Sequence, residues 1–284
     1  MGETPDYNFR DAPDADYYEP PSQSGRGRWV VGLIVIAVIG AAVYLWNRVP
    51  EPAPATAPGD VTETTAKPNS VPVDTDVFPV DVPPLDASDP LVRELVNQLS
   101  SHPRIAAWLA TRGLIRSFTV VVTNVAEGKT PSGQLSVLRP AAKFAVAERG
   151  SDLVIDPRSY ERFDALAAAA ESLDPAGTAK LYRTLKPRIE EAHRELGGSD
   201  ASFDATLERA IVLLLRTPVR DEPMRVEPKG IGYVFASPEV ERLAPAQKQL
   251  LRTGPRNARA IQASLRNLAR ALGIPDARLP PVAP

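Results

Sequence analysis

The sequence predicts a mainly α protein that has a single-pass transmembrane helix, a disordered Pro-rich linker and a mostly helical globular domain with one or two small β-hairpins. Three observations predict this fold class. Residues 29–46 form an uninterrupted apolar run, and residues 47–84 contain nine prolines. From residue 85 onward, apolar side chains recur at helical spacing between proline and glycine stops.

The first 28 residues are polar and acidic, and they lack apolar periodicity. A segment of this composition cannot bury enough apolar surface to offset the entropy of folding. We therefore expect residues 1–28 to form a disordered tail.

The apolar run at residues 29–46 predicts a transmembrane helix. Eighteen residues at about 1.5 Å rise span about 27 Å, close to the hydrocarbon thickness of a bilayer. Aromatic and basic side chains at both ends favour the membrane interface. These predicted interface residues are Arg28, Trp29, Tyr44, Trp46 and Arg48.

The distribution of basic residues predicts the orientation of the helix. Arg10, Arg26 and Arg28 precede the span, whereas Arg48 and the more distant Lys67 follow it. This bias favours a cytoplasmic N-terminus and an exported C-terminal domain. A cleaved signal peptide is the alternative, but such a peptide begins with a short basic region rather than a 28-residue acidic tail.

Residues 47–84 are rich in Pro, Ala and Thr and contain one glycine. Proline-rich chains are extended and semi-rigid, and about 37 residues at roughly 3.1 Å each would reach on the order of 100 Å. The predicted linker therefore allows the globular domain at residues 85–284 to act away from the membrane surface.

The first part of this domain is predicted to contain three helices. Ser88-Asp89-Pro90 begins one that continues to about Leu99, and His102-Pro103 begins another that ends before Gly113. Residues 114–125 have apolar side chains at helical spacing, although the β-branched run at 119–123 is typical of a strand. We predict a helix there.

A short hairpin is predicted next, with strands at residues 143–148 and 152–155 around Arg149-Gly150-Ser151. Asp156-Pro157 and Asp174-Pro175 each place an N-cap acceptor before a proline at the first helical position. The first predicts one helix through about Ala170. The second predicts a helix that kinks or restarts at Pro187 and ends at Gly197-Gly198.

The last third is predicted to contain an apolar helix at residues 203–216 and a second small strand pair, Arg225-Val226 with residues 231–235. Ser237-Pro238 should begin a short helix, and residues 255–272 should form a long one.

Composition excludes several kinds of chemistry. The chain has no cysteine and two histidines, so it has no disulfide, no Cys-ligated metal and no Cys nucleophile. Glu190 and His193 form one Glu-x-x-His pair, but di-iron bundles need two such pairs and two further glutamates. No Gly-x-Ser-x-Gly motif or phosphate-binding loop is present. We predict no catalytic residue, no metal site and no cofactor.

A basic segment near the C-terminus predicts the candidate binding site. Residues 242–278 contain eight Lys or Arg side chains and one acidic residue. Gly254-Pro255 marks a helix start, where free N–H groups and the helix dipole attract anions. The candidate anion- or partner-binding residues are Lys248, Arg252, Arg256, Asn257 and Arg259.

The partner predicted for this segment is an acidic envelope component or a lipid headgroup, and not nucleic acid, which an exported domain would not meet. The leading hypothesis is a non-catalytic binding or scaffold module. The alternative is a cell-envelope hydrolase that cleaves cell-wall polymer through paired carboxylates, because distant Asp and Glu side chains can meet in a fold.

Five separate segments occur in order along the chain: Pro84–Asp89, Leu114–Phe118, Asp156–Asp164, Phe235–Leu243 and Gln247–Asn257. Together they resemble a bacterial envelope family catalogued as domain of unknown function 3014. The resemblance spans about residues 72–275 and implies a Gram-negative inner-membrane protein with one helix and a periplasmic domain. It implies no reaction, ligand or catalytic residue.

Overall fold

The computed structural model describes residues 77–198, 202–230 and 232–281. The predicted tail, the predicted span at residues 29–46 with its five interface residues, and most of the predicted linker lie outside the described residues. Within the described part, no single helix has the length and apolarity needed to cross a membrane. One pair bent by 109°, Pro103–Leu109 with Leu114–Ala126, passes that test by length and composition only.

The described chain is mostly helical and has two small antiparallel hairpins, as the sequence predicted. The helices are α2 (Asp89–Asn97), α3 (Pro103–Leu109), α4 (Leu114–Ala126), α5 (Arg158–Glu161), α6 (Asp164–Glu171), α7 (Pro175–Glu195), α8 (Phe203–Leu215), α9 (Pro238–Glu241), α10 (Pro245–Leu251) and α11 (Pro255–Ala271). The strands are β1 (Val146–Arg149), β2 (Asp152–Ile155), β3 (Val226–Lys229) and β4 (Gly232–Phe235).

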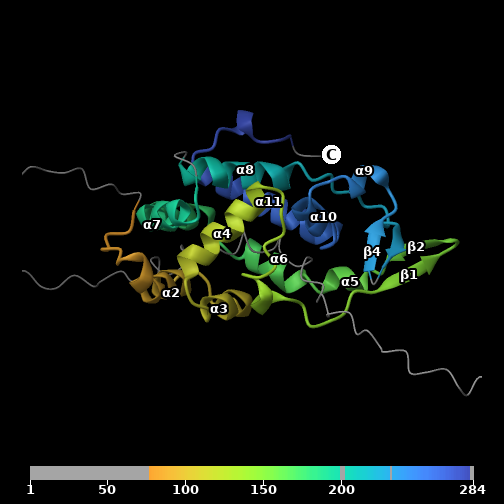
Figure 1. Cartoon of the computed structure of the whole chain (residues 1–284), viewed down its shortest axis with the longest axis horizontal. Coiled ribbons are helices and arrows are strands. Elements are labelled where there is room, and N and C mark those ends of the chain that lie inside the picture. The colour runs from red at the N-terminus through yellow and green to blue at the C-terminus, as the bar shows by residue number, and fades with distance from the viewer. Residues whose placement is uncertain (1–76, 199–201, 231, 282–284) are drawn as a thin grey trace, which may run out of the picture.

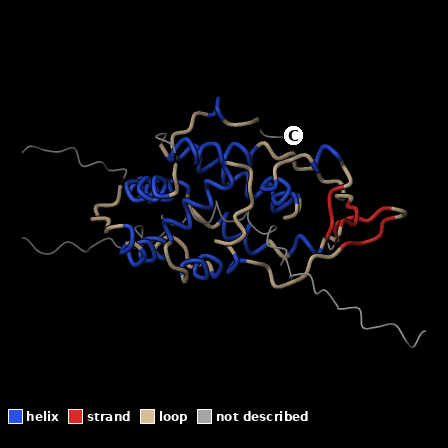
Figure 2. Tube along the Cα trace, in the orientation of Figure 1, coloured by secondary structure: helices blue, strands red, loops and turns tan. Residues whose placement is uncertain are grey.

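The elements form an elongated body in which helices and strands are segregated. Helices α2, α3 and α7 lie at one end, and both hairpins lie at the other (Figure 1). The strands occupy only that second end (Figure 2). Helices α4, α8 and α11 lie between the two ends, so the hydrophobic core is built from helices.

Helix α4 shows how burial decides the conformation of a β-branched segment. Seven of its side chains are buried, and they recur at helical spacing from Leu114 to Val125. The helix packs against both α7 and α8. Burial of this face outweighs the preference of Thr119–Thr123 for a strand, which confirms the predicted helix.

Helices α7 and α8 contact each other through aromatic packing and a polar cluster. Phe203 is fully buried, and its ring lies 5.7 Å from that of Phe118 and 5.3 Å from that of His193. Tyr182 Oη donates a 2.5 Å hydrogen bond to Asp204 Oδ1, and Lys186 Nζ contacts Asp204 Oδ2. These contacts join the start of α8 to the middle of α7.

The polar cluster predicts a dependence of stability on pH. Burial raises the pKa of Asp204, but hydrogen bonds from Lys186 and Tyr182 outweigh burial and hold this pKa below its ordinary value. Such a carboxylate contributes stability above its unfolded-state pKa, about 3.9, and the contribution is lost as the pH falls through the folded-state pKa. We expect wild type to exceed Asp204→Asn in stability at pH 7 and to lose that advantage below about pH 4.

Urea denaturation of both proteins between pH 2 and pH 7, followed by circular dichroism, measures this difference. A stability difference that stays constant over the whole range would contradict the role assigned to the Asp204 carboxylate.

The two hairpins meet along one edge. The Ile155 N–H donates to the Met224 carbonyl at 3.0 Å, and a single bridge pairs Val154 with Arg225. Gly150 adopts a positive φ of 63° in the turn that the sequence predicted. The strand pair at residues 226–235 is likewise confirmed. The segment that leads into β3 is therefore held against the end of β2.

One predicted helix was wrong in detail, and for another the structure excludes one of the two predicted alternatives. The helix predicted after Asp156-Pro157 is split into α5 and α6. At the break, Arg162 Nε donates to the Ser159 carbonyl at 2.8 Å, and the Phe163 N–H donates to Tyr160 instead. The side chain of Arg162 thus takes the acceptor that a continuous helix would use.

Helix α7 does not restart at Pro187, because residues 175–195 form one helix with this proline inside it. Leu185 and Ile189 are both buried on either side of the proline. Their burial stabilises the helical conformation against the loss of one backbone hydrogen bond. The helix start at Asp174 is confirmed, since its carboxylate accepts a 2.6 Å hydrogen bond from the Gly177 N–H.

Residues 77–84, which the sequence analysis placed in the linker, pack on α7. Phe78 is buried, and its N–H donates to Thr184 Oγ1 at 2.9 Å. Arg188 donates to the carbonyls of Val82 and Pro83. The chain therefore enters the folded body along α7, at the end opposite the hairpins (Figure 1).

Candidate functional site

The predicted basic segment forms α10, α11 and the loop between them, and the structure gives each predicted site residue a partner within the protein. Lys248 Nζ donates to Glu241 Oε1 at 2.7 Å and to the Glu241 carbonyl at 2.9 Å. Glu241 also accepts a hydrogen bond from the Phe235 N–H. Burial raises the pKa of Glu241, but these two donors outweigh it and hold the pKa below its ordinary value. Lys248 therefore connects α10 to α9, and Glu241 connects α9 to β4.

Arg252 and Phe235 form a second contact between the basic segment and the hairpin. The Arg252 guanidinium lies over the Phe235 ring, 4.7 Å from its centroid. Phe235 is itself buried. A cation over a buried ring favours packing of α10 against β4.

Asn257 is buried and has a structural role. Its side chain is 4% exposed, and its amide nitrogen donates to Asp164 Oδ1 at 2.8 Å and to the carbonyls of Tyr160 and Thr253. This side chain ties the start of α11 to α5 and α6. Its amide nitrogen is therefore fully engaged by partners inside the protein.

Gly254 and Arg256 precede Asn257 and differ in their surroundings. Gly254 has a φ of 88°, and a Cβ at this position would lie 2.5 Å from the Tyr160 ring. The helix start therefore presses directly on α5. Arg256 points outward with 86% of its side chain exposed, and its guanidinium lies 3.8 Å from Asp164 Oδ2.

Arg259 is the predicted residue that lines an open cavity. Its guanidinium makes two hydrogen bonds to Asp221, at 2.6 and 2.8 Å. The Arg259 guanidinium holds the pKa of the Asp221 carboxyl below its usual range. The two side chains come from distant segments, α11 and the loop that follows α8.

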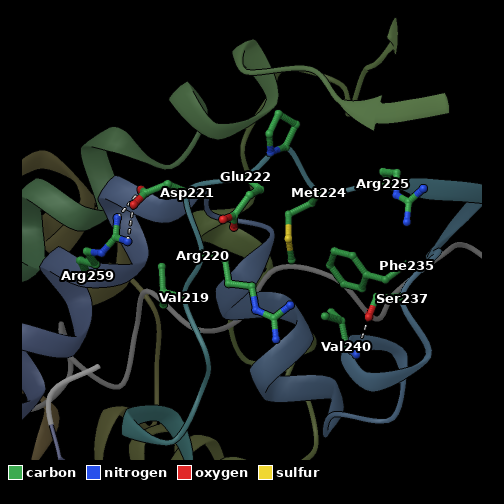
Figure 3. Close-up of a pocket in the computed structure, with 11 residues that line it drawn as sticks. Val219, Arg220, Asp221, Glu222, Met224, Arg225, Phe235, Ser237, Val240 and Arg259 are labelled. Carbon is green, nitrogen blue, oxygen red and sulfur yellow. Dashed lines mark hydrogen bonds and ion pairs between the residues drawn. The ribbon is translucent and has the colours of Figure 1, made fainter. Parts of the chain in front are cut away.

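This cavity, which we call the loop pocket, has a volume of about 650 Å³ (Figure 3). The loop that connects α8 to β3 forms one wall, and β4, α9 and α11 supply the rest. Three arginines and two carboxylates share the cavity with five apolar side chains and one serine. Its lining residues are Val219, Arg220, Asp221, Glu222, Pro223, Met224, Arg225, Phe235, Ser237, Val240 and Arg259.

The other two arginines of the loop pocket are held at its rim. Arg220 contacts Glu239 at 3.4 Å, and Arg225 contacts Asp152 at the same distance. All four side chains of these two pairs are about half exposed or more. Exposed ion pairs at such distances contribute little stability. Both arginines can therefore turn toward a bound anion at low cost.

The segment that forms the wall is anchored by its neighbours. Gln262 Nε2 donates to the carbonyls of Leu214 and Thr217 at 3.0 Å, which fixes the end of α8 on α11. Tyr160 makes a backbone hydrogen bond with Met224 that lowers its pKa, but burial dominates and raises the pKa of Tyr160 to about 12. The loop is thus fixed at both ends by side chains of other elements.

A second cavity of about 300 Å³, which we call the helix pocket, adjoins the loop pocket. The two share Val219 and Arg259, so Arg259 stands at their junction. The C-terminal segment closes the far side of the helix pocket. The helix pocket is lined by Leu215, Val219, Arg259, Gln262, Ala263, Arg266, Asn267 and Pro281.

Arg259 was predicted from the sequence, but residues 219–225, the other half of the site, were not. The signal was present, because Pro218 and Pro223 enclose the charged run Arg220-Asp221-Glu222 between a helix and a strand. Proline pairs of this kind mark a loop, and loops often carry binding residues.

The Glu190–His193 pair has a structural role. Glu190 accepts hydrogen bonds from Ser202 Oγ at 2.8 Å and from the Phe203 N–H at 3.0 Å, so it caps the start of α8. The His193 ring is buried against Phe203. Among the described residues, no group of three or more His, Cys, Asp or Glu side chains is placed to hold a metal ion.

Comparison with known proteins assigns the chain to a family. A family model described as "Protein of unknown function (DUF3014)" matches residues 114–269, which include both pockets except for Pro281. No curated protein matches the chain. No solved structure matches it either.

Proposed function

The chain belongs to the DUF3014 family, whose description assigns no activity, and we propose that it is a membrane-anchored binding module of the bacterial envelope that takes an acidic ligand or partner in the loop pocket. In this proposal residues 29–46 cross the inner membrane once. The N-terminus is cytoplasmic and the domain is periplasmic. The apolar run and the arginines before it support this placement.

The loop pocket is the observation that most strongly supports a binding function. Arg259, Arg220 and Arg225 line it together. Of the other predicted site residues, Lys248, Arg252 and Asn257 are engaged in structural contacts, and Arg256 points outward. A cavity lined by several charged groups and by apolar side chains is typical of a ligand site. Guanidinium groups suit carboxylate ligands because they bind both oxygens at once.

The position of the pocket favours a partner away from the membrane over a lipid headgroup. The described chain begins beside α2 and α7, and β4 and α9 lie at the opposite end (Figure 1). A linker that joins the domain at residue 77 would leave the loop pocket facing away from its attachment point. This arrangement suits capture of an envelope component at a distance from the bilayer.

The pocket does not favour the hydrolase alternative. A two-carboxylate hydrolase needs two carboxyl groups that both face the bound substrate. Both oxygens of Asp221, one of the two carboxylates in the loop pocket, are instead held by Arg259 at 2.6 and 2.8 Å. We therefore propose binding without catalysis.

Site-specific photocrosslinking in living cells tests this function. A photoreactive residue in place of Glu222 lies in the loop pocket, and one in place of Glu94 lies on the exposed face of α2 as a matched control. We expect a discrete crosslinked product at position 222 that is absent at position 94. Adding Arg259→Ala should reduce the product at least several-fold.

Two outcomes would contradict the proposal. One is the same product at both positions, which would indicate contact without a site. The other is a product at position 222 that Arg259→Ala leaves unchanged, which would show that the arginine of the pocket does not hold the partner.

A further inference from the structure

We propose that the ligand of the loop pocket is the carboxyl terminus of a peptide whose last side chain is apolar, and that its carboxylate takes the place of Asp221 on Arg259. This inference rests on the proposed function, because it names the ligand class of the same pocket. It follows from four features: the ion pair, the charge of the cavity, its apolar floor and the adjoining helix pocket.

The Arg259–Asp221 pair shows that the site already binds a carboxylate in the required geometry. Two oxygens meet two guanidinium nitrogens at 2.6 and 2.8 Å. The side chain of Asp221 is 75% exposed and that of Arg259 is 44% exposed. An exposed pair is weak because water competes for both partners. An incoming carboxylate can therefore exchange with Asp221 while the same two hydrogen bonds re-form.

The charges around the cavity favour a monoanion over a dianion. Three arginines and two carboxylates line the loop pocket, and Glu239 and Asp152 pair with two of these arginines from outside the lining. A ligand carboxylate that displaces Asp221 adds one negative charge there. A phosphate dianion would leave an excess negative charge beside Asp221 and Glu222, which opposes binding.

The floor of the loop pocket is apolar and lies to one side of the ion pair. Val219, Phe235 and Val240 are buried side chains that line the cavity, and Met224 is partly buried beside them. Figure 3 shows Met224, Phe235 and Val240 gathered on the side of the pocket away from Arg259. A ligand held at Arg259 can therefore place an apolar group on this floor, which gains hydrophobic burial.

The helix pocket can hold the part of the ligand peptide that precedes its C-terminal residue. It begins at Arg259 and extends along α11, past the exposed amide of Asn267. The α-carbon of a C-terminal residue carries three groups: a carboxylate, a side chain and the preceding amide. Arg259 at the junction, the apolar floor and the helix pocket offer one place for each. A simple carboxylic acid would use only the first two.

The test uses acetyl-Ala-Leu as the probe and the full-length chain in detergent, with binding measured by calorimetric titration. The C-terminal amide of the same probe lacks the negative charge, and 4-methylpentanoate lacks the peptide group. Arg256→Gln is the matched control for Arg259→Gln, since both remove one arginine from α11 but Arg256 does not line either pocket. Circular dichroism verifies that each variant is folded.

We expect acetyl-Ala-Leu to bind wild type and to bind Asp221→Asn about three- to tenfold more tightly, because the competing carboxylate is gone. Arg259→Gln should weaken binding about tenfold or more, and Arg256→Gln should leave it unchanged. The amide probe should bind at least tenfold more weakly than the acid.

Several results would overturn the inference. They are an absence of binding to Asp221→Asn at 10 mM probe, equal binding of the acid and its amide, and an affinity that Asp221→Asn does not increase. Binding of 4-methylpentanoate as tight as that of the peptide would assign the pocket to free carboxylic acids instead. If Arg259-dependent crosslinking at position 222 persists in any of these cases, the binding function stands and only the ligand class is wrong.

Discussion

Replacing Phe203 with alanine is expected to lower the free energy of unfolding by about 3–5 kcal/mol, the range for removal of a fully buried aromatic side chain. Phe203 is 0% exposed and packs against Phe118, Tyr182 and His193. The first of these neighbours lies on α4 and the other two on α7, so the substitution leaves a cavity where three helices meet. We expect the large value because such a site cannot collapse without moving whole helices.

Chemical denaturation of the full-length chain, followed by circular dichroism, measures this loss. Leu196→Ala is the control, because Leu196 also carries a large apolar side chain but is 48% exposed. It should change the free energy of unfolding by less than about 1 kcal/mol. Equal losses for the two variants would show that the packing around Phe203 does not stabilise the domain.

Local signals predicted much of the fold because the structure uses them locally. Asp174 caps α7 through its own carboxylate, and Gly150 makes the turn of the first hairpin. The apolar face of α4 identified a helix in spite of its β-branched residues, since burial of that face determines the conformation. These features need only neighbours in sequence or one repeating pattern.

The errors have tertiary causes. The break between α5 and α6 depends on Arg162, whose side chain takes a backbone acceptor from the helix. Helix α10 was not predicted, although Pro245 and a Gln247 side chain that accepts from the Ala244 N–H mark its start. No periodic pattern in the sequence marks this short helix. Its contacts with α8, α11 and Glu241 make it a separate element.

In the candidate site, too, local features could be predicted from the sequence and tertiary contacts could not. The excess of basic residues at positions 242–278 was visible in the sequence, but the carboxylates that meet them were not. Asp221 lies 38 positions from Arg259, and Asp164 lies 93 positions from Asn257. Most of the predicted anion-binding residues therefore serve the fold, and Arg259, the one that lines a cavity, is paired with the carboxylate that is most exposed.

Gly254→Ala is expected to destabilise the domain by about 3 kcal/mol or more, although it adds a single methyl group. A φ of 88° with a ψ of 161° is a backbone conformation that is nearly confined to glycine and costs other residues about 1–3 kcal/mol. The new Cβ would also lie 2.5 Å from the Tyr160 ring. Because Tyr160 is packed between the start of α11 and the loop at Met224, its ring cannot move away freely, and overpacking adds about 1–3 kcal/mol.

Gly273→Ala is the matched control for this substitution. Gly273 has a nearly equal φ of 85°, but a Cβ there would meet nothing within 4 Å. It should therefore show the backbone cost alone, about 1–2 kcal/mol. The excess loss in Gly254→Ala, measured by the same denaturation experiment, reports the contact with Tyr160 together with the cost of the extended ψ of 161° at Gly254. Because that contact also orients the loop at Met224, Gly254→Ala should weaken crosslinking at position 222 under conditions where the protein remains folded. Equal losses for the two glycine variants would mean that Tyr160 yields to the methyl group and that α11 does not depend on α5 for its position beside the loop pocket.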